Sequence, residues 1–163
     1  MRCIKYKSSF LFGDIIDFNS PLYGIGQGSV DSIVLHHDYT VSFILDIRQG
    51  NKFGGPSPNL YEGFQTCHMR LARECEKKLD QVNSDTSIRS PFVFNDLVEF
   101  KSKLNGSGKG RIIEIIIDSY MNINYVIEDD DGQHYYGINA NETKSVNGSD
   151  YSQHELIIEY LQQ

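Results

Sequence analysis

The sequence predicts a mainly β protein made of two small antiparallel β-barrels joined by one helix. Three observations predict this fold. The chain repeats itself at a distance of 82 residues, each copy has short apolar or alternating segments beside glycine-rich turns, and a segment between the copies has apolar residues at helical spacing. We expect the N-terminal barrel at 1–55, the helix and a linker at 56–91, and the C-terminal barrel with a tail at 92–163.

Composition limits the classes to which the protein can belong. The chain has 163 residues, of which 39% are hydrophobic and 12% aromatic, enough for a packed core and too many for global disorder. No apolar run approaches the roughly 18 residues that a membrane-spanning helix needs. Three cysteines are too few for a disulfide-stapled scaffold. These features predict a protein of the reducing cytoplasm that does not enter a membrane.

The repeat aligns Phe10–Asp46 with Phe92–Glu128 without a gap, and 10 of the 37 pairs are identical, which makes chance a poor explanation. Each copy begins with a short apolar strand, continues through three glycines at alternate positions, and enters a second strand. Glycine permits positive φ angles and close backbone approach, as a sharp turn requires. The predicted turn glycines are Gly24, Gly26 and Gly28 in the first copy and Gly106, Gly108 and Gly110 in the second.

The rest of each copy also has a β pattern. In the third strand apolar residues alternate, which places Tyr125 on the buried face. Asp131-Gly132 is a strong hairpin signal, and of the adjacent Tyr135 and Tyr136 one must be exposed. Five short strands per copy are enough to curl into a small barrel, which closes most of the sheet edges.

The segment Leu60–Val82 between the copies has apolar residues at helical spacing, and we expect one amphipathic helix there. Its polar side carries a basic stripe. Residues 83–91 are polar and without period, as in a linker. The segment 152–161 fits either a helix capped by Ser152 or a final strand. The basic stripe of the predicted helix consists of Arg70, Arg73, Lys77 and Lys78.

The second copy resembles a known motif. Its run FNDLVEFKSKLNGSGKGRIIEII is similar to the KOW motif of Tudor/SH3-like small barrels, which recurs in ribosomal and transcription-elongation proteins. The matching skeleton is Asp96, Val98, Gly106, Gly108, Gly110 and Ile112. The resemblance implies two tandem SH3-like barrels. The first copy lacks the bases of the motif, because Gln27 and Ser29 stand where the second has Lys109 and Arg111.

The size and organisation of the chain also resemble a small early protein of T-even bacteriophages. This resemblance implies a phage early protein that acts in the host cytoplasm or nucleoid. It further implies binding to double-stranded DNA with little sequence preference, and perturbation of the host nucleoid or of transcription.

The residues themselves indicate a DNA-binding loop. Four cations flank the second glycine turn, whose backbone N–H groups can approach phosphate oxygens. The competing interpretation is a solvated loop whose bases offset nearby acids. The helical stripe at 70–78 is a second, weaker candidate surface because Glu74 and Glu76 lie within reach for ion pairs. The four loop cations are Lys101, Lys103, Lys109 and Arg111.

We expect neither catalysis nor a cofactor nor a metal. GSGKG lacks the spacing and the Lys-Ser/Thr pair of a P-loop, and the histidines stand in no nucleophile motif. Cys67, His68 and Cys75 share a segment but lack a fourth ligand at a usual spacing, so core thiols are the better interpretation. The repeated acids Asp14 and Asp96 are expected to serve the fold by bonding loop N–H groups.

Net charge opposes the DNA hypothesis. The chain carries 15 basic and 22 acidic residues, a net charge of -7, with all the excess acid in 92–163. Binding to DNA therefore requires a local basic patch, with the acidic hairpin at 128–131 facing away from it. The alternative is an adaptor or inhibitor that docks a host nucleoid or transcription protein through its barrels. A salt-dependent DNA-binding assay separates the two hypotheses.

Overall fold

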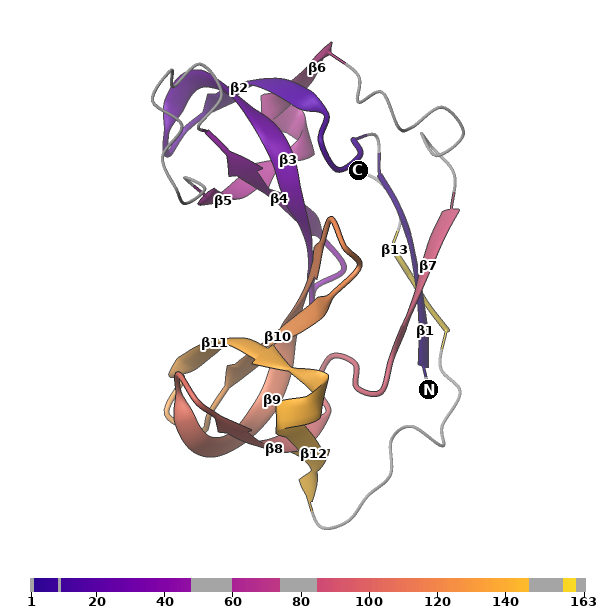
Figure 1. Ribbon diagram of the computed structural model, residues 1–163, viewed down its shortest axis with the longest axis vertical. Helices are drawn as coiled ribbons and strands as arrows, with labels where there is room; N and C mark the ends of the chain where they lie inside the picture. The colour runs from indigo at the N-terminus through magenta and orange to yellow at the C-terminus, as the bar shows by residue number, and fades with distance from the viewer. Residues whose placement is uncertain (1, 9, 48–59, 74–84, 147–156, 161–163) are drawn as a thin grey trace.

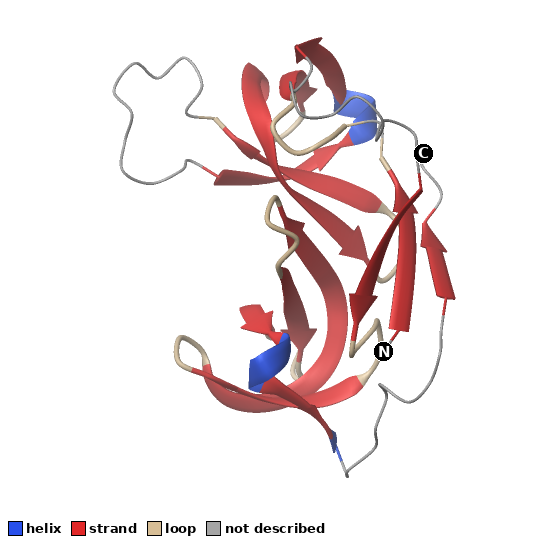
Figure 2. Cartoon of the chain, turned by 45° about the vertical axis from the view of Figure 1, so that its right-hand side comes forward, coloured by secondary structure: helices blue, strands red, loops and turns tan. Residues whose placement is uncertain are grey.

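The computed structural model describes residues 2–8, 10–47, 60–73, 85–146 and 157–160. Within these ranges the chain is built almost entirely of β-strands, and its helical elements are two 3-10 turns of three residues each (Figures 1 and 2). The prediction of a mainly β protein is confirmed. The described residues contain no helix long and apolar enough to span a membrane.

Two units of five strands follow each other along the chain, and each has a 3-10 turn before its last strand. The N-terminal unit consists of β2 (Ile15–Ser20), β3 (Gly24–His36), β4 (Val41–Asp46), β5 (Leu60–Gln65), the 3-10 turn Thr66–His68 and β6 (Met69–Arg73). The C-terminal unit consists of β8 (Leu97–Ser102), β9 (Gly106–Asp118), β10 (Ile123–Glu128), β11 (His134–Asn139), the 3-10 turn Ala140–Glu142 and β12 (Thr143–Ser145).

The strands pair in the same order in both units. The orders are β6-β2-β3-β4-β5 and β12-β8-β9-β10-β11, and all these pairs are antiparallel. Among the described residues no ladder joins β5 to β6 or β11 to β12, so neither unit is closed by hydrogen bonds. The expected closed barrels are therefore not observed. Each unit does have five strands, but two of those in the N-terminal unit, β5 and β6, lie in the segment that was expected to be a helix.

The two units are parts of one ten-stranded sheet, because β3 of the first unit pairs with β9 of the second. Both strands are 13 residues long, and their second halves form the shared ladder. At its centre Val34 lies opposite Ile116, its own counterpart in the repeat. An approximate two-fold axis therefore relates the units, as in a symmetric dimer. Figure 1 shows them as upper and lower lobes joined by this ladder.

A small sheet follows the same symmetry. It contains β1 (Arg2–Lys7), β7 (Asp85–Ser90) and β13 (Ile157–Tyr160), in the order β13-β1-β7. In the β1–β7 ladder Lys5 lies opposite Ser87, again 82 residues away. The repeat thus includes these strands, which the 37-residue alignment left out. Figure 1 shows the small sheet beside the junction of the two lobes.

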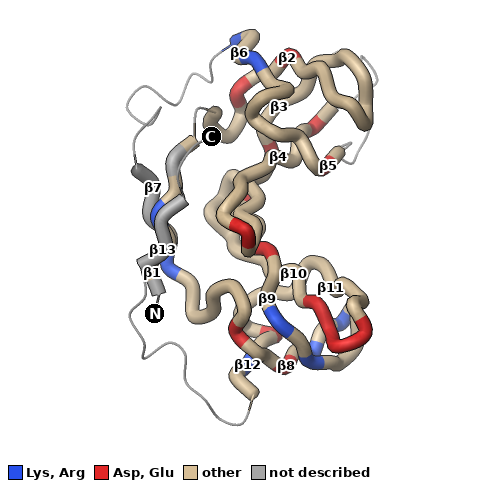
Figure 3. The backbone as a smooth tube through the Cα atoms, turned by 180° about the vertical axis from the view of Figure 1, so that it is seen from behind, with Lys and Arg blue, Asp and Glu red and all other residues tan. Residues whose placement is uncertain are grey.

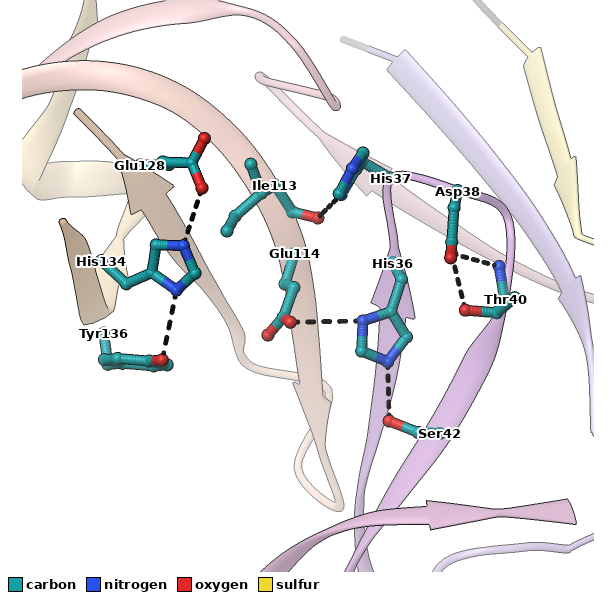
Figure 4. Close-up of polar contacts among 10 residues, drawn as sticks. All are labelled: His36, His37, Asp38, Thr40, Ser42, Ile113, Glu114, Glu128, His134 and Tyr136. Atoms are coloured by element: carbon teal, nitrogen blue, oxygen red, sulfur yellow. Dashed lines mark hydrogen bonds and ion pairs between the residues drawn. The ribbon is translucent and has the colours of Figure 1, made fainter. Parts of the chain in front are cut away.

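One continuous core connects all these parts. Ile33 and Leu35 of β3 and Ile115 and Ile117 of β9 are at most 2% exposed and belong to the same apolar cluster as Ile4 of the small sheet. On the opposite side of the ladder lies a polar contact between the units (Figure 4). His36 and Glu114 are opposite one another there, with His36 Nδ1 3.2 Å from Glu114 Oε1. The described parts of the two units and of the small sheet thus share one core.

The repeated acids do serve the fold, as predicted. Asp14 is 1% exposed and its Oδ2 accepts a hydrogen bond from the backbone N–H of Leu11 at 2.9 Å. Asp96 is 9% exposed and does the same for Val93 at 2.9 Å. Each carboxylate thus closes the turn that leads into the first strand of its unit.

The predicted helix at 60–82 is wrong for the residues that the structure describes. Leu60–Gln65 and Met69–Arg73 are strands, paired with β4 and β2 respectively. Pairing to two neighbouring strands outweighs the helical spacing of the apolar residues. Among the described residues of the expected apolar face, only Phe64 is fully buried, while Leu60 and Leu71 are 44% and 37% exposed. Residues 74–84 lie outside the described ranges.

The remaining local predictions have mixed outcomes. Tyr125 is fully buried, and Tyr136 is 51% exposed while Tyr135 is half-buried, as expected. A hairpin turn does lie at Gly132, whose φ is 80°. In the segment 152–161 the described residues 157–160 form a strand, in agreement with the second alternative, and the other residues of the segment lie outside the described ranges.

We predict a single cooperative unfolding transition, because the two units share one core. Leu35 is fully buried in the β3–β9 ladder. Leu35→Ala should lower the free energy of unfolding by about 2–5 kcal/mol and move the whole transition to lower temperature. Scanning calorimetry provides the measurement, with equal calorimetric and van't Hoff enthalpies expected. Two resolved transitions, of which only one shifts in the variant, would contradict the shared core.

We also predict a stability loss at alkaline pH that depends on Tyr125. Burial raises the pKa of Tyr125 above its ordinary 10.0, although hydrogen bonds with Ser90 and Phe92 oppose the shift. The folded pKa exceeds the unfolded one, so this contribution to stability is complete below 10.0 and disappears as pH rises through the folded pKa. Urea unfolding between neutral and alkaline pH should show a shallower decline for Tyr125→Phe than for the wild type.

The internal repeat supplies a precedent for this variant, because Phe43 occupies the position of Tyr125 in the N-terminal unit. At neutral pH the loss of the buried hydroxyl should cost about 1 kcal/mol. Tyr120→Phe is the control, since Tyr120 is 85% exposed and should decline like the wild type. If Tyr125→Phe declined just as steeply, ionisation of Tyr125 would not be the cause.

Candidate nucleic-acid interface

The predicted cations lie together on the outer surface of the C-terminal unit. Lys101 is on β8, Lys109 and Arg111 are on β9, and Lys103 is in the turn between these strands; all four are exposed. Residues two apart on a strand share a face, so Lys109 and Arg111 point to the same side. Figure 3 shows the basic residues of this lobe along β8 and β9.

Lys144 of β12 is a fifth cation of the same surface. It lies opposite Glu99 of β8, and Glu99 lies opposite Lys109 of β9. The three side chains therefore stand side by side across three strands. A hollow is lined by residues of these strands and of the neighbouring 3-10 turn, among them Lys101, Lys109 and Lys144. We call the five exposed cations the basic face: Lys101, Lys103, Lys109, Arg111 and Lys144.

The partners of these cations are few. Lys144 Nζ lies 3.5 Å from Glu99 Oε2, and Arg111 Nη1 donates a hydrogen bond of 2.7 Å to the backbone oxygen of Asn95. Within the part of the chain that the structure describes, none of Lys101, Lys103, Lys109 and Arg111 forms an ion pair. Their charges are available to an anion in solution.

The glycines of β9 allow this strand to lie very close to its neighbour beneath the basic face. Of the three predicted turn glycines only the first in each copy has a positive φ, 75° at both Gly24 and Gly106. The others lie within β3 and β9 rather than in the turn, which corrects the prediction. A Cβ on Gly110 would collide with the backbone of Glu128, so β9 crosses β10 at close range between Lys109 and Arg111.

Acids lie closer to the basic face than the sequence suggested. Glu128 is opposite Arg111 in the β9–β10 ladder, so the acidic hairpin at 128–131 does not face away. Glu128 Oε2 lies 2.7 Å from His134 Nε2, as Figure 4 shows. The pKa of Asp129 is lowered, mainly by the hydrogen bond from the Gln133 backbone N–H and also by that from the Tyr135 hydroxyl. Asp129 therefore stays ionised at neutral pH and reduces the local positive potential.

The N-terminal unit has the same strand arrangement, but different side chains occupy the equivalent surface positions. Asp17 takes the place of Glu99, and Arg70 Nη2 lies 3.3 Å from Asp17 Oδ2, an ion pair equivalent to that between Lys144 and Glu99. Gln27, in the place of Lys109, donates a 2.8 Å hydrogen bond to Asp17. Of the predicted helical stripe, Arg70 and Arg73 lie on β6, away from the basic face, and Lys77 and Lys78 lie outside the described ranges.

The alignment of the two copies at a distance of 82 residues does not reach Lys144, because the distance between equivalent residues changes after the third strand. Beyond residue 60 the units correspond at a distance of 74 residues, as from Gly63 to Gly137, which have φ values of 85° and 70°. The same shift aligns Tyr61 with Tyr135 and Arg70 with Lys144. A search that allowed a gap after the third strand would have found these pairs.

Two further predictions concern the cysteines and a metal site. Cys67 is exposed in the 3-10 turn rather than in a core, which corrects that prediction, and Cys75 is outside the described residues. The described residues contain no group of three or more His, Cys, Asp or Glu side chains placed to hold a metal. Comparison of the chain with protein-family models, with curated proteins and with solved structures finds no match.

Proposed function

We propose that the protein binds double-stranded DNA through phosphate contacts with little sequence discrimination. The observation that supports this proposal is the basic face, where four exposed cations lack ion pairs to any described carboxylate. Each cation that approaches a phosphate releases a condensed counterion, and this gain does not depend on base sequence. No cofactor and no catalytic step belong to the proposal.

We further propose that the two units are tandem SH3-like barrels of the KOW kind. The support is the five-strand order common to both units, together with the 13-residue second strands and the 3-10 turn before each last strand. The proposed setting is the host cytoplasm, where an early phage protein would contact the nucleoid.

The net charge of the protein and the local charge of the basic face act on DNA over different distances. The net charge of -7 repels DNA at long range, but at physiological salt charges are screened beyond about 8 Å. The basic face therefore acts only after close approach. Glu99 lies within it and bonds Lys144, and this acid weakens the attraction. A local patch on an acidic protein should bind DNA weakly and with strong dependence on salt.

We predict that removal of the four cations of the basic face that lack ion pairs to described carboxylates nearly abolishes this salt dependence. If the four cations each contact one phosphate, the logarithm of the binding constant should fall with that of salt with a slope of about -4. The quadruple variant Lys101→Ala, Lys103→Ala, Lys109→Ala and Arg111→Ala should bind at least tenfold more weakly at low salt, with a nearly flat slope. Fluorescence anisotropy with an arbitrary duplex at several salt concentrations is the measurement.

Arg73→Ala is the matched control for a lost surface cation, because Arg73 is exposed on the other unit. It should leave both affinity and slope unchanged. An unchanged slope in the quadruple variant would refute the assignment of the site.

We predict that neutralising the acid within the basic face strengthens DNA binding. Glu99→Gln keeps the shape of the side chain but frees Lys144 and removes a negative charge beside Lys109. The affinity for duplex DNA should rise several-fold at low salt, and the gain should vanish at high salt. Asp17→Asn, the equivalent change in the N-terminal unit, should have no effect. An equal gain in the two variants would mean that net charge matters and position does not.

One observation favours the adaptor function as a second candidate. The N-terminal unit exposes large apolar side chains, with Leu22, Ile25 and Tyr61 at 75%, 85% and 41% exposure. Such residues fit a protein partner better than a phosphate. An adaptor that does not bind DNA would show negligible duplex binding in both the wild type and the quadruple variant.

A further inference from the structure

A leucine projects into solvent at the tip of each unit. Leu22 lies in the turn between β2 and β3 and is 75% exposed, and Leu104 lies in the equivalent turn between β8 and β9 and is 92% exposed. A single exposed leucine is ordinary on a protein surface. Leu104, however, lies in a tightly held turn and has exposed cations beside it.

The turn that carries Leu104 is tightly held. Ser102 is 8% exposed, and its Oγ accepts hydrogen bonds from the backbone N–H groups of Leu104 at 3.2 Å and Asn105 at 3.3 Å. Asn105 Nδ2 donates a 2.8 Å hydrogen bond to the backbone oxygen of Tyr136 on β11. The next residue, Gly106, has the positive φ of 75° that completes the turn. Leu104 is thus presented by a folded frame, and its side chain does not pack against the core.

The charges beside the two tips differ. Lys103 precedes Leu104, and Lys101 and Lys109 lie on the adjoining strands, all exposed. At the equivalent positions the N-terminal unit has Pro21, Asn19 and Gln27, none of them charged. Leu104 is therefore an apolar point surrounded by cations, whereas Leu22 has the same turn without the cations. Duplex DNA, with stacked bases between two rows of phosphates, matches that combination of groups.

We propose that Leu104 is a wedge that inserts between base pairs from the minor groove while Lys101, Lys103 and Lys109 hold the flanking phosphates. This inference depends on the proposed function and specifies how the duplex is deformed. Apolar side chains such as leucine and methionine unstack base steps in this way and kink and unwind the helix. Flexible pyrimidine–purine steps are the easiest to open, so binding should favour them modestly over stiff A-tracts.

The test measures unwinding and affinity separately. Closed-circular plasmid is relaxed by topoisomerase I in the presence of the full-length protein, and the linking number is read from a gel after the protein is removed. Wild type should lower the linking number in proportion to the protein bound. Leu104→Ser should lose at least four-fifths of this change at equal occupancy, and Leu104→Met, which restores an apolar wedge, should recover most of it.

Leu22→Ser is the matched control, because it removes an exposed leucine from the equivalent turn without neighbouring cations. It should unwind the plasmid as the wild type does. Calorimetry on each variant establishes that it is folded.

Two results overturn the wedge while leaving the proposed function intact: salt-dependent binding of the wild type with no change in linking number, or full unwinding by Leu104→Ser. A loss in Leu22→Ser equal to that in Leu104→Ser would overturn the assignment to the basic tip. If the wild type failed to bind the duplex at low salt, the proposed function itself would fall.

Discussion

The antiparallel pairing of β3 with β9 is the interaction on which the rest of the structure depends. Each strand is long enough to pair with one strand of its own unit along its first half, and along its second half with another strand of its own unit on one edge and with the other unit on the opposite edge. The side chains of this junction, such as Ile33 and Ile117, are at most 2% exposed and join one core with the small sheet. A backbone ladder over such a core holds the units in one orientation. The basic face is thereby carried mainly on strands of a rigid frame, with Lys103 in the turn between two of them.

Duplication and divergence account for the surface. Both units have the same strand arrangement, and the carboxylates Asp14 and Asp96 close equivalent turns in them. The exposed positions of the frame differ between the units, as is possible where substitutions cost little stability. Lys109 replaces Gln27 without disturbing the ladder beneath it. The basic face on one unit and a neutral or apolar surface on the other follow from such differences, and an overall negative charge is compatible with a locally basic patch.

Much of the fold was predictable from the sequence, and the failures have physical causes. The alternation of apolar residues and the glycines between the segments located the strands of the 37-residue repeat, because both features depend on local backbone geometry. The segment after residue 60 failed because its apolar spacing fits a helix in isolation, whereas its pairing with distant strands is decided by tertiary structure. The junction was missed as well. Its signal was the apolar run from Ile112 to Ile117, which only Glu114 interrupts, as expected of a strand covered on both faces. The four loop cations of the candidate site were found from sequence, while Lys144 required the strand pairing.

The central claim is that one fold, present twice, offers DNA a binding surface on the C-terminal unit only. Backbone amide chemical shifts, recorded by NMR while a short duplex is titrated into the labelled protein, test it most directly. The account predicts shifts confined to β8, β9, β12 and the turn at 103–105, with the equivalent residues of β2, β3 and β6 unmoved. Shifts on the N-terminal unit of equal size, or none anywhere at low salt, would contradict it.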